Sequence, residues 1–239
     1  MAKVLVVFDF DYSLINDNSD TYVIEQLTPH LMEVMKDLRR TTFKGQWTKL
    51  MHHMVNKMMA EEGVTLQAMN ECLSKIPIFA ENIEAVRLAS ERGCELAVLS
   101  DANTHYIDVI LDHNGMLPLF SRIVTNYAKL DEVTGVLCVA PHQPEDSPHS
   151  CTNCPPNLCK GGVLTAWRNE LPADCRIVYI GDGGGDFCPC TTLREGDVIL
   201  CRKQWSLHKK IKASEVPIAA EVVPWETGVH ILETFQRVL

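Results

Sequence analysis

The chain has 239 residues, of which 46% are hydrophobic and 22% charged, the composition of an ordinary globular protein with one large domain or one domain carrying an insertion. Its formal charge of -9 argues against broad nucleic-acid binding and against an anionic membrane surface as partner. No apolar run approaches the roughly 20 residues that cross a bilayer. The apolar run before Asp9 is too short for the core of a secretory signal, so we expect a cytoplasmic protein.

Four continuous apolar runs predict buried parallel strands, because such strands are covered on both faces. They lie at Val4–Phe8, Cys94–Ser100, Cys175–Asp182 and Asp197–Cys201. Helical patterns separate them at Glu81–Arg92, Thr104–Asn114, Gly161–Glu170 and from about Trp225 to Arg237. Two β-prone runs around "DEVTG" in residues 121–141 predict a hairpin or a pair of edge strands. The alternation predicts an α/β fold with a doubly wound, mostly parallel sheet, which binds ligands at the carboxyl ends of its strands.

Residues 19–75 interrupt this alternation with helical spacing and no strand signal, which predicts a small helical insertion after the first strand. We expect a core α/β domain formed by residues 1–16 and 77–239, and a helical cap domain formed by residues 17–76. The methionines of the insertion and the pair His52–His53 favour a helical core with exposed histidines over a ligand-binding stripe.

Polar residues follow each predicted strand or open a predicted helix. They are Asp9, Asp11 and Ser13 after the first strand, Ser100 and Asp101 after the second, Lys160 at a helix start, and Asp182 and Asp186 around a glycine run. Carboxylates that converge at one sheet edge cannot all be ionised without a cation, and hard oxygen ligands suit Mg²⁺. With a lysine and a hydroxyl beside them, they form the kind of site that phosphoryl transfer requires, in which a carboxylate can be the nucleophile.

The same residues carry a resemblance to known phosphohydrolases. "DFDYS", "VLSD", Lys160 and "GDGGGD" resemble the four motifs of the haloacid dehalogenase superfamily. The longer strings "SDANT", "SPHSCTNCPPNLCKG" and "GDGGGDFCP" resemble the phosphoethanolamine/phosphocholine phosphatase family and its plant pyrophosphatase-like and pyridoxal-phosphate phosphatase-like relatives. The resemblance implies a Rossmann-like core sheet with a cap inserted after the first strand, and phosphoric monoester hydrolysis.

The resemblance also implies a role for each matching residue. Asp9 would be the nucleophile, and Asp11 the general acid–base that also offers its backbone carbonyl to the metal. Ser100 would bind the phosphoryl group and Lys160 would neutralise it. The metal-binding residues implied in this way are Asp9, Asp11, Asp182 and Asp186, the last of which would support the site.

Two further acidic residues bear on the substrate. Asp20 and Asp101 match positions that the family uses near the amino-alcohol end of the substrate, where two carboxylates could hold an ammonium group. The alternatives are that Asp20 caps the first helix of the insertion and that Asp101 only ends a strand. Ser13 stands where the family usually has threonine and keeps its hydroxyl, so it joins Lys160 in the predicted substrate-binding set. Tyr12 is bulky where the family usually carries a charged residue.

We therefore expect a Mg²⁺-dependent phosphohydrolase that cleaves phosphoethanolamine or phosphocholine through an aspartyl-phosphate intermediate. Pyridoxal 5′-phosphate and pyrophosphate are alternative substrates for the same site. A phospho-accepting, receiver-like signalling module uses similar residues, but it needs about half this length and has no helical insertion. An inactive binding protein is disfavoured because every chemical position is filled. The expected partner is a small phosphorylated metabolite, with neither nucleic acid nor membrane; the sequence leaves the oligomeric state open.

The loop before Lys160 is rich in metal-binding residues. It contains His149, Cys151, Cys154 and Cys159 in "HSCTNCPPNLCK". Cys151, Cys154 and Cys159 could bind a structural Zn²⁺ with the nearby histidine, and Cys188 and Cys190 in "DFCPC" could lie near them. A second C-x₂-C pair at the usual zinc-ribbon spacing is missing. The alternatives are reduced thiols packed in a proline-rich loop or a disulfide formed on oxidation, and the sequence favours these two over zinc.

Overall fold

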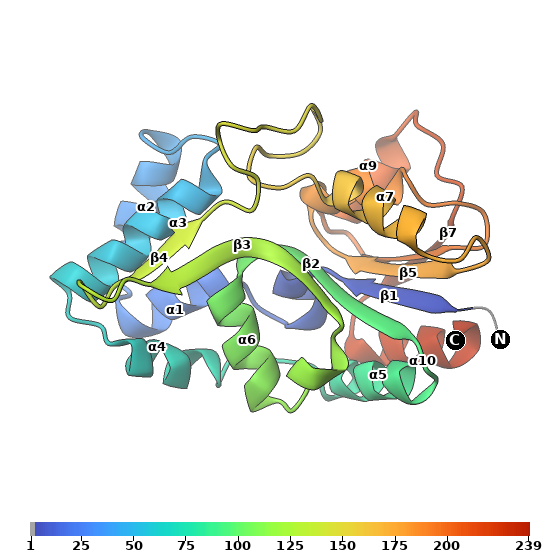
Figure 1. The fold of residues 1–239 in the computed structure, drawn as a ribbon, viewed down its shortest axis with the longest axis horizontal. Helices are drawn as coiled ribbons and strands as arrows, with labels where there is room; N and C mark the ends of the chain where they lie inside the picture. Colours follow the sequence, from blue (N-terminus) through green and yellow to red (C-terminus); the bar gives the residue numbers. More distant parts are fainter. Residues whose placement is uncertain (1–2) are drawn as a thin grey trace.

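The computed structural model describes residues 3–239 (Figure 1), so the first two residues of the predicted core domain lie outside the described residues. Residues 3–239 contain one seven-stranded sheet in the order β4-β3-β2-β1-β5-β6-β7. Its strands are β1 (Val4–Phe8), β2 (Glu95–Asn103), β3 (Arg122–Leu130), β4 (Leu137–Ala140), β5 (Arg176–Gly181), β6 (Val198–Arg202) and β7 (Glu221–Trp225). All neighbouring strands run parallel except β3 and β4, which form the predicted antiparallel hairpin. The predicted α/β fold class is confirmed.

Helices cover both faces of the sheet (Figure 1). One face packs against α5 (Ala80–Glu91), α6 (Thr104–His113) and α10 (Gly228–Val238), and the other against α7 (Lys160–Glu170) and α9 (Ser206–Ala213). Alternate residues of the central strand β1 divide between the two cores: Val6 and Phe8 face the first, Leu5 and Val7 the second. The apolar run at β1 is continuous because both of its faces are buried.

The segment after β1 folds into helices, as predicted. It contains α1 (Ser19–Leu27), α2 (Leu31–Arg40), α3 (Trp47–Asn56) and α4 (Leu66–Leu73), which lie together at the left of Figure 1, toward the carboxyl end of β1. Met51, Met54 and Met69 are buried in the core of this helical insertion. The chain enters and leaves the insertion side by side, because the Asn16 amide donates to the Pro77 carbonyl at 2.7 Å. The domain limits at residues 16 and 77 stay a prediction.

The hairpin of the sheet reaches the helical insertion. The β4 strand lies along α3, where the Val139 amide donates to His52 Nδ1 at 3.1 Å. The neighbouring Leu137 amide lies 3.2 Å from the Met59 sulfur. His52 therefore joins two elements, and His53 is exposed.

The C-terminal region differs from the prediction. Trp225 does not begin a helix: it is the last residue of β7, and α10 begins at Gly228. Neither β7 nor α9 was predicted from the sequence. β7 is an edge strand, where Pro224 is tolerated because residues 221 and 225 make the backbone hydrogen bonds toward the sheet, and such strands lack the continuous apolar run of a central strand. Within the described residues, no helix has the length and apolar character needed to span a membrane.

The packing of α10 on the sheet gives a test of the core. Phe235 is fully buried and its ring lies 5.9 Å from that of Phe8. We expect Phe235→Ala to lower the free energy of unfolding by about 3–5 kcal/mol, because it removes an aromatic side chain and leaves a cavity. Val229→Ala, at a position on the same helix that is 43% exposed, should change it by less than about 0.5 kcal/mol. Urea unfolding measures both; equal effects would contradict the assigned packing.

Candidate active site

The polar residues predicted from the sequence converge on one cavity. It has a volume of about 180 Å³ and lies between the carboxyl ends of β1, β2 and β5 and the helical insertion. Its lining comprises Asp9, Asp11, Tyr12, Asn18, Trp47, Ser100, Asp101, Lys160, Asp182, Gly183, Gly185 and Asp186. Ser13 and Asp20 are buried near this cavity without lining it.

The turn after β1 has an unusual backbone. Tyr12 has φ of +55°, a left-handed conformation that is uncommon for a bulky residue. Neighbouring side chains hold the turn in place: Arg202 donates to the Tyr12 carbonyl at 2.8 Å. Asn82 donates to the carbonyls of Ser13 and Leu14 at 3.1 and 2.9 Å. The positions of the two carboxylates in this turn are therefore fixed by contacts from α5 and β6.

A buried lysine joins the first and last motifs. Lys160, the first residue of α7, places Nζ 2.9 Å from Asp9 Oδ1 and 2.8 Å from Asp186 Oδ1. Burial alone would lower the pKa of Lys160, but the carboxylates of Asp186 and Asp9 raise it well above its usual value, so the group stays protonated. Burial likewise opposes ionisation of Asp186, yet Lys160 lowers the pKa of that carboxyl.

Asp186 is fully used as a hydrogen-bond acceptor. Its Oδ1 also accepts from the Tyr179 hydroxyl at 2.7 Å, and its Oδ2 accepts from the amides of Asp182 at 3.2 Å and Gly183 at 2.9 Å. A Cβ on Gly181 would lie 2.7 Å from Asp186 Cγ, so this close approach requires glycine. The contacts make Asp186 better placed to position Lys160 than to bind a metal; its predicted place in the metal set stays a prediction.

Asp9 and Asp182 each keep one oxygen available. Asp9 Oδ1 accepts from Phe10 N at 2.7 Å and from Lys160, and Asp182 Oδ1 accepts from the Ser13 hydroxyl at 3.2 Å. Among residues 3–239, no donor is hydrogen-bonded to Oδ2 of either carboxylate. Burial, followed by repulsion from Asp186, raises the pKa of Asp9 and brings the pKa of Asp182 to about 7.

This donor set fits a hard divalent cation. Carboxylate oxygens of Asp9, Asp182 and Asp186 all lie within 4.8 Å of one another. Lys160 is the cation paired with this group in the described part of the chain, so one positive charge faces three buried carboxyl groups. A metal with oxygen preference would balance the remaining charge, and Mg²⁺ meets that requirement.

Asp11 is held away from the lysine. Its carboxylate accepts from the Ser19 amide at 2.9 Å and from Asn18 Nδ2 at 3.0 Å, at the start of α1. Burial raises the pKa of Asp11 to about 6, although the hydrogen bonds from Ser19 lower it. A carboxyl group with a pKa near neutrality can both give and accept a proton under working conditions.

Ser100 and Asp101 lie where β2 leaves its regular pairing with β3. The register is irregular beyond Leu99, and such irregularities redirect side chains. Ser100 Oγ accepts from the Ala102 amide at 3.2 Å. Asp101 faces the cavity, and its Oδ1 accepts from Asn157 Nδ2 at 2.7 Å. Burial raises the pKa of Asp101.

Asp20 contacts an aromatic side chain. Its Oδ2 accepts from the Trp47 indole N–H at 2.8 Å, and Trp47 lines the cavity whereas Asp20 does not. The helix cap of α1 is Asn18, whose side chain accepts from the Thr21 amide, so the capping alternative for Asp20 is wrong. Burial, followed by repulsion from Asp11, raises the pKa of Asp20 to about 7.

Three residues at the site were not assigned a role from the sequence. Asn18 and Trp47 come from the helical insertion. Nothing in the local pattern marks Trp47 as a site residue, whereas Asn18 lies in the string "NDNSD", which also resembles the family. Asn157, which supports Asp101, lies in the string "PPNLCK" that carries the family resemblance, so the same resemblance could have indicated it.

The cysteines of the loop before Lys160 lie outside this cavity. The ten cysteines, all within the described residues, are free thiols. Sulfurs of Cys151, Cys154, Cys159 and Cys188 gather within 4.8 Å of one another. The expected neighbour His149 is not in this group, since its Nε2 lies 2.9 Å from the Pro155 carbonyl oxygen.

Solved structures define the class of protein to which this fold belongs. A substrate-bound phosphoserine phosphatase has a TM-score of 0.64 at 14% identity, covering 98% of this chain and 99% of that chain. A phospho-aspartyl intermediate analogue of phosphoserine phosphatase has a TM-score of 0.63 at 16% identity, with the same coverage. At this identity the likeness concerns the fold, which is that of the haloacid dehalogenase phosphatases.

Sequence comparison then gives the family. The family described as "Putative Phosphatase" matches residues 4–239. A thiamine phosphate phosphatase-like protein of Arabidopsis thaliana is 38% identical, covering 100% of this chain and 95% of its own. Inorganic pyrophosphatase 2 of Arabidopsis thaliana is 35% identical, covering 100% of this chain and 84% of its own. Pyridoxal phosphate phosphatase PHOSPHO2 of Bos taurus is also 35% identical, covering 98% of this chain and 98% of its own. The chain belongs to this family of haloacid dehalogenase phosphatases, which confirms the predicted enzyme class.

The ion pairs of Lys160 give a test of the site's electrostatics. In protein without added Mg²⁺, we expect Lys160→Met to lower the free energy of unfolding by about 3–5 kcal/mol, because it leaves buried carboxylates without their cation. Lys209→Met, at an exposed position of α9, should have little effect. Chemical denaturation at pH 7.5 measures both, and a loss below about 1 kcal/mol at Lys160 would contradict the buried ion-pair network.

Proposed function

We propose that this phosphatase is Mg²⁺-dependent and cleaves small phosphomonoesters through an aspartyl-phosphate on Asp9. The observation that carries the proposal is the arrangement of Asp9, whose Oδ1 is held by Lys160 and the Phe10 amide while Oδ2 accepts no hydrogen bond from residues 3–239. A carboxylate fixed through one oxygen presents the other as a nucleophile. Phosphatases of the superfamily generally use Mg²⁺.

The residues of the chain support the two halves of such a reaction. Asp9 attacks phosphorus, and the bond from phosphorus to the leaving oxygen breaks as protonated Asp11 gives that oxygen its proton. Asp11, now a carboxylate, takes a proton from a water molecule that attacks the aspartyl-phosphate, which releases inorganic phosphate and restores Asp9. Lys160 and Ser100 orient the phosphoryl oxygens in both steps.

The carboxylates of Asp9 and Asp182 would hold the metal, together with the backbone carbonyl of Asp11. When bound, Mg²⁺ supplies positive charge to the phosphoryl oxygens and lets Asp9 remain ionised beside them. The Ser13 hydroxyl then orients Asp182 through the hydrogen bond to Oδ1.

The far side of the cavity supports a cationic leaving group. Asp101 lines it and is half-buried, and Asp20, which accepts from the Trp47 indole, is a buried carboxyl group. An ammonium or quaternary amine would satisfy this negative potential and could rest against the Trp47 indole. We therefore propose phosphoethanolamine or phosphocholine as substrate. The helical insertion contributes Asn18 and Trp47, which supports its role as a cap.

Larger substrates of the relatives form the second possibility. Tyr12 and Trp47 both border the cavity, and aromatic rings there favour the heterocycle of pyridoxal 5′-phosphate or thiamine phosphate. Pyrophosphate fits less well, because its second phosphate would face the carboxylate of Asp101 instead of a cation.

The nucleophile is tested by Asp9→Asn. We expect kcat on a chromogenic phosphate ester with Mg²⁺ to fall at least about 10³-fold, since an amide cannot form the covalent intermediate. Asp37→Asn, an exposed position on α2, is the matched control and should keep full activity. A rate for Asp9→Asn within tenfold of the unchanged protein would rule out the mechanism.

The substrate class is tested by comparing kcat/KM. Phosphoethanolamine, phosphocholine, pyridoxal 5′-phosphate, thiamine phosphate and pyrophosphate would be measured beside glycerol 3-phosphate, which lacks a cationic group. We expect the amine-bearing esters to exceed glycerol 3-phosphate by about tenfold or more, the size of one unscreened charge interaction. Asp101→Asn, which keeps an acceptor for Asn157, should abolish that preference without slowing glycerol 3-phosphate. Equal values in the unchanged protein would refute the ammonium pocket.

A further inference from the structure

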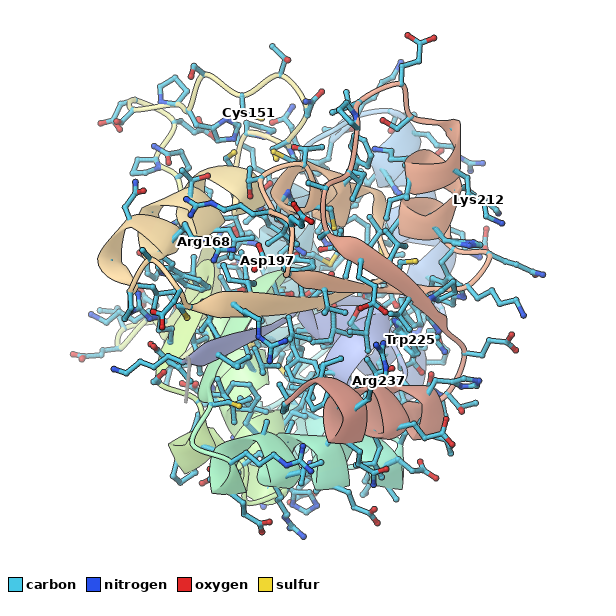
Figure 2. The ribbon with its side chains drawn as sticks, turned by 90° about the vertical axis from the view of Figure 1, so that its right-hand side faces the viewer. Cys151, Arg168, Asp197, Lys212, Trp225 and Arg237 are labelled. Carbon is cyan, nitrogen blue, oxygen red and sulfur yellow. The ribbon has the colours of Figure 1, made fainter. Side chains whose placement is uncertain are left out.

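The four-cysteine group lies beside the active site but takes no part in the chemistry proposed there. Cys151, Cys154 and Cys159 come from the loop between β4 and α7, and Figure 2 shows Cys151 in that loop. Cys188 comes from the short helix α8 (Phe187–Cys190), after the glycine run. Two segments that are distant in sequence therefore bring their sulfurs to one point.

The sulfur spacing separates a metal site from a disulfide. A disulfide bond joins sulfurs about 2.0 Å apart. Cys151 Sγ and Cys188 Sγ lie 3.7 Å apart, and all four sulfurs are within 4.8 Å of one another. A tetrahedral zinc with Zn–S bonds of about 2.3 Å holds its sulfurs about 3.8 Å apart. The group already has nearly the dimensions of that tetrahedron.

The surrounding backbone is shaped around these sulfurs. Cys159 caps α7, because its Sγ accepts from the Gly162 amide at 3.3 Å. A Cβ on Gly161 would lie 2.5 Å from Cys188 Sγ, so the first turn of α7 approaches Cys188 as only glycine permits. A backbone amide donor and the start of α7 therefore lie beside the sulfur of Cys159.

We propose that Cys151, Cys154, Cys159 and Cys188 bind one structural Zn²⁺ ion. Four thiolates fill the tetrahedral shell of zinc and leave no open position, which is the pattern of structural rather than catalytic sites. Soft thiolate ligands also separate this ion from Mg²⁺, which prefers the carboxylate oxygens of the neighbouring cavity. The chain thus holds two metal sites of opposite chemical preference.

The zinc site would act as a clamp on the active site. Cys159 precedes Lys160 directly, and Cys188 follows Asp186 by two residues. The ion would therefore tie together the two segments whose side chains form the Lys160–Asp186 ion pair. It positions the lysine without contacting the substrate.

Metal analysis of the 239-residue protein, purified without chelators from zinc-supplemented medium, tests the site. We expect about one zinc per chain by inductively coupled plasma mass spectrometry, and less than about 0.2 in Cys154→Ser and Cys188→Ser. Cys138→Ser, a partly buried cysteine outside the group, should keep its zinc. Asp9→Asn should keep it as well, so failure of the zinc site and failure of the phosphatase mechanism are distinguished.

A second measurement covers the case in which the serine variants fail to fold. The unchanged protein would be titrated with a mercurial thiol reagent in the presence of a chromogenic zinc indicator, and zinc release should follow modification of four thiols. Zinc below about 0.1 per chain in the unchanged protein would overturn the proposal. So would zinc retained by both serine variants, iron in its place, or an intact mass lower by two hydrogen atoms, which marks a disulfide.

Discussion

The buried ammonium group of Lys160 is the interaction on which the rest of the site depends. It contacts Asp9 and Asp186 at the same time, in a place where water cannot screen carboxylates from one another. The negative charge of Asp186 is better stabilised than that of Asp9, because Asp186 also accepts hydrogen bonds from two amides and a tyrosine hydroxyl. Asp9 and Asp182 are left without a cation of their own, so the charge of the site is one that the proposed metal would balance.

The fold supplies the stiffness that this assembly requires. Parallel strands end at one edge, so β1, β2 and β5 deliver their polar residues to a single point, and α7 adds the lysine. The left-handed turn at Tyr12 needs additional support, which comes from Arg202 on β6. The guanidinium of Arg202 stacks on Trp205 at 4.4 Å and on Trp225 at 5.0 Å, so even the edge strand β7 helps to hold the turn that follows Asp9.

The features that could be predicted are those that produce a recognisable pattern of residues within a short stretch of sequence. The central strands were found because burial on both faces produces an unbroken apolar run. The polar residues that meet at the cavity were singled out because each follows such a strand or opens a helix. The edge strand β7 left no such run, and Trp225 was placed in a helix because an aromatic residue suits either element. Trp47 was missed because its contact with the cavity depends on how α3 packs, which no nearby pattern reports. Cys188 could only be named as a possible neighbour, since its place beside Cys151 depends on the path of two loops.

The contact between α3 and β4 has a consequence for how this architecture can vary. The helices are inserted at Asn16 and Pro77, yet they also hold the β3–β4 hairpin through His52 and Val139. Excising residues 17–76 would deprive the Val139 amide of its acceptor and expose the side of the hairpin that α3 covers. The insertion and the hairpin therefore form one exchangeable unit: a chimera that transplants the helices from a relative must carry that relative's hairpin with them.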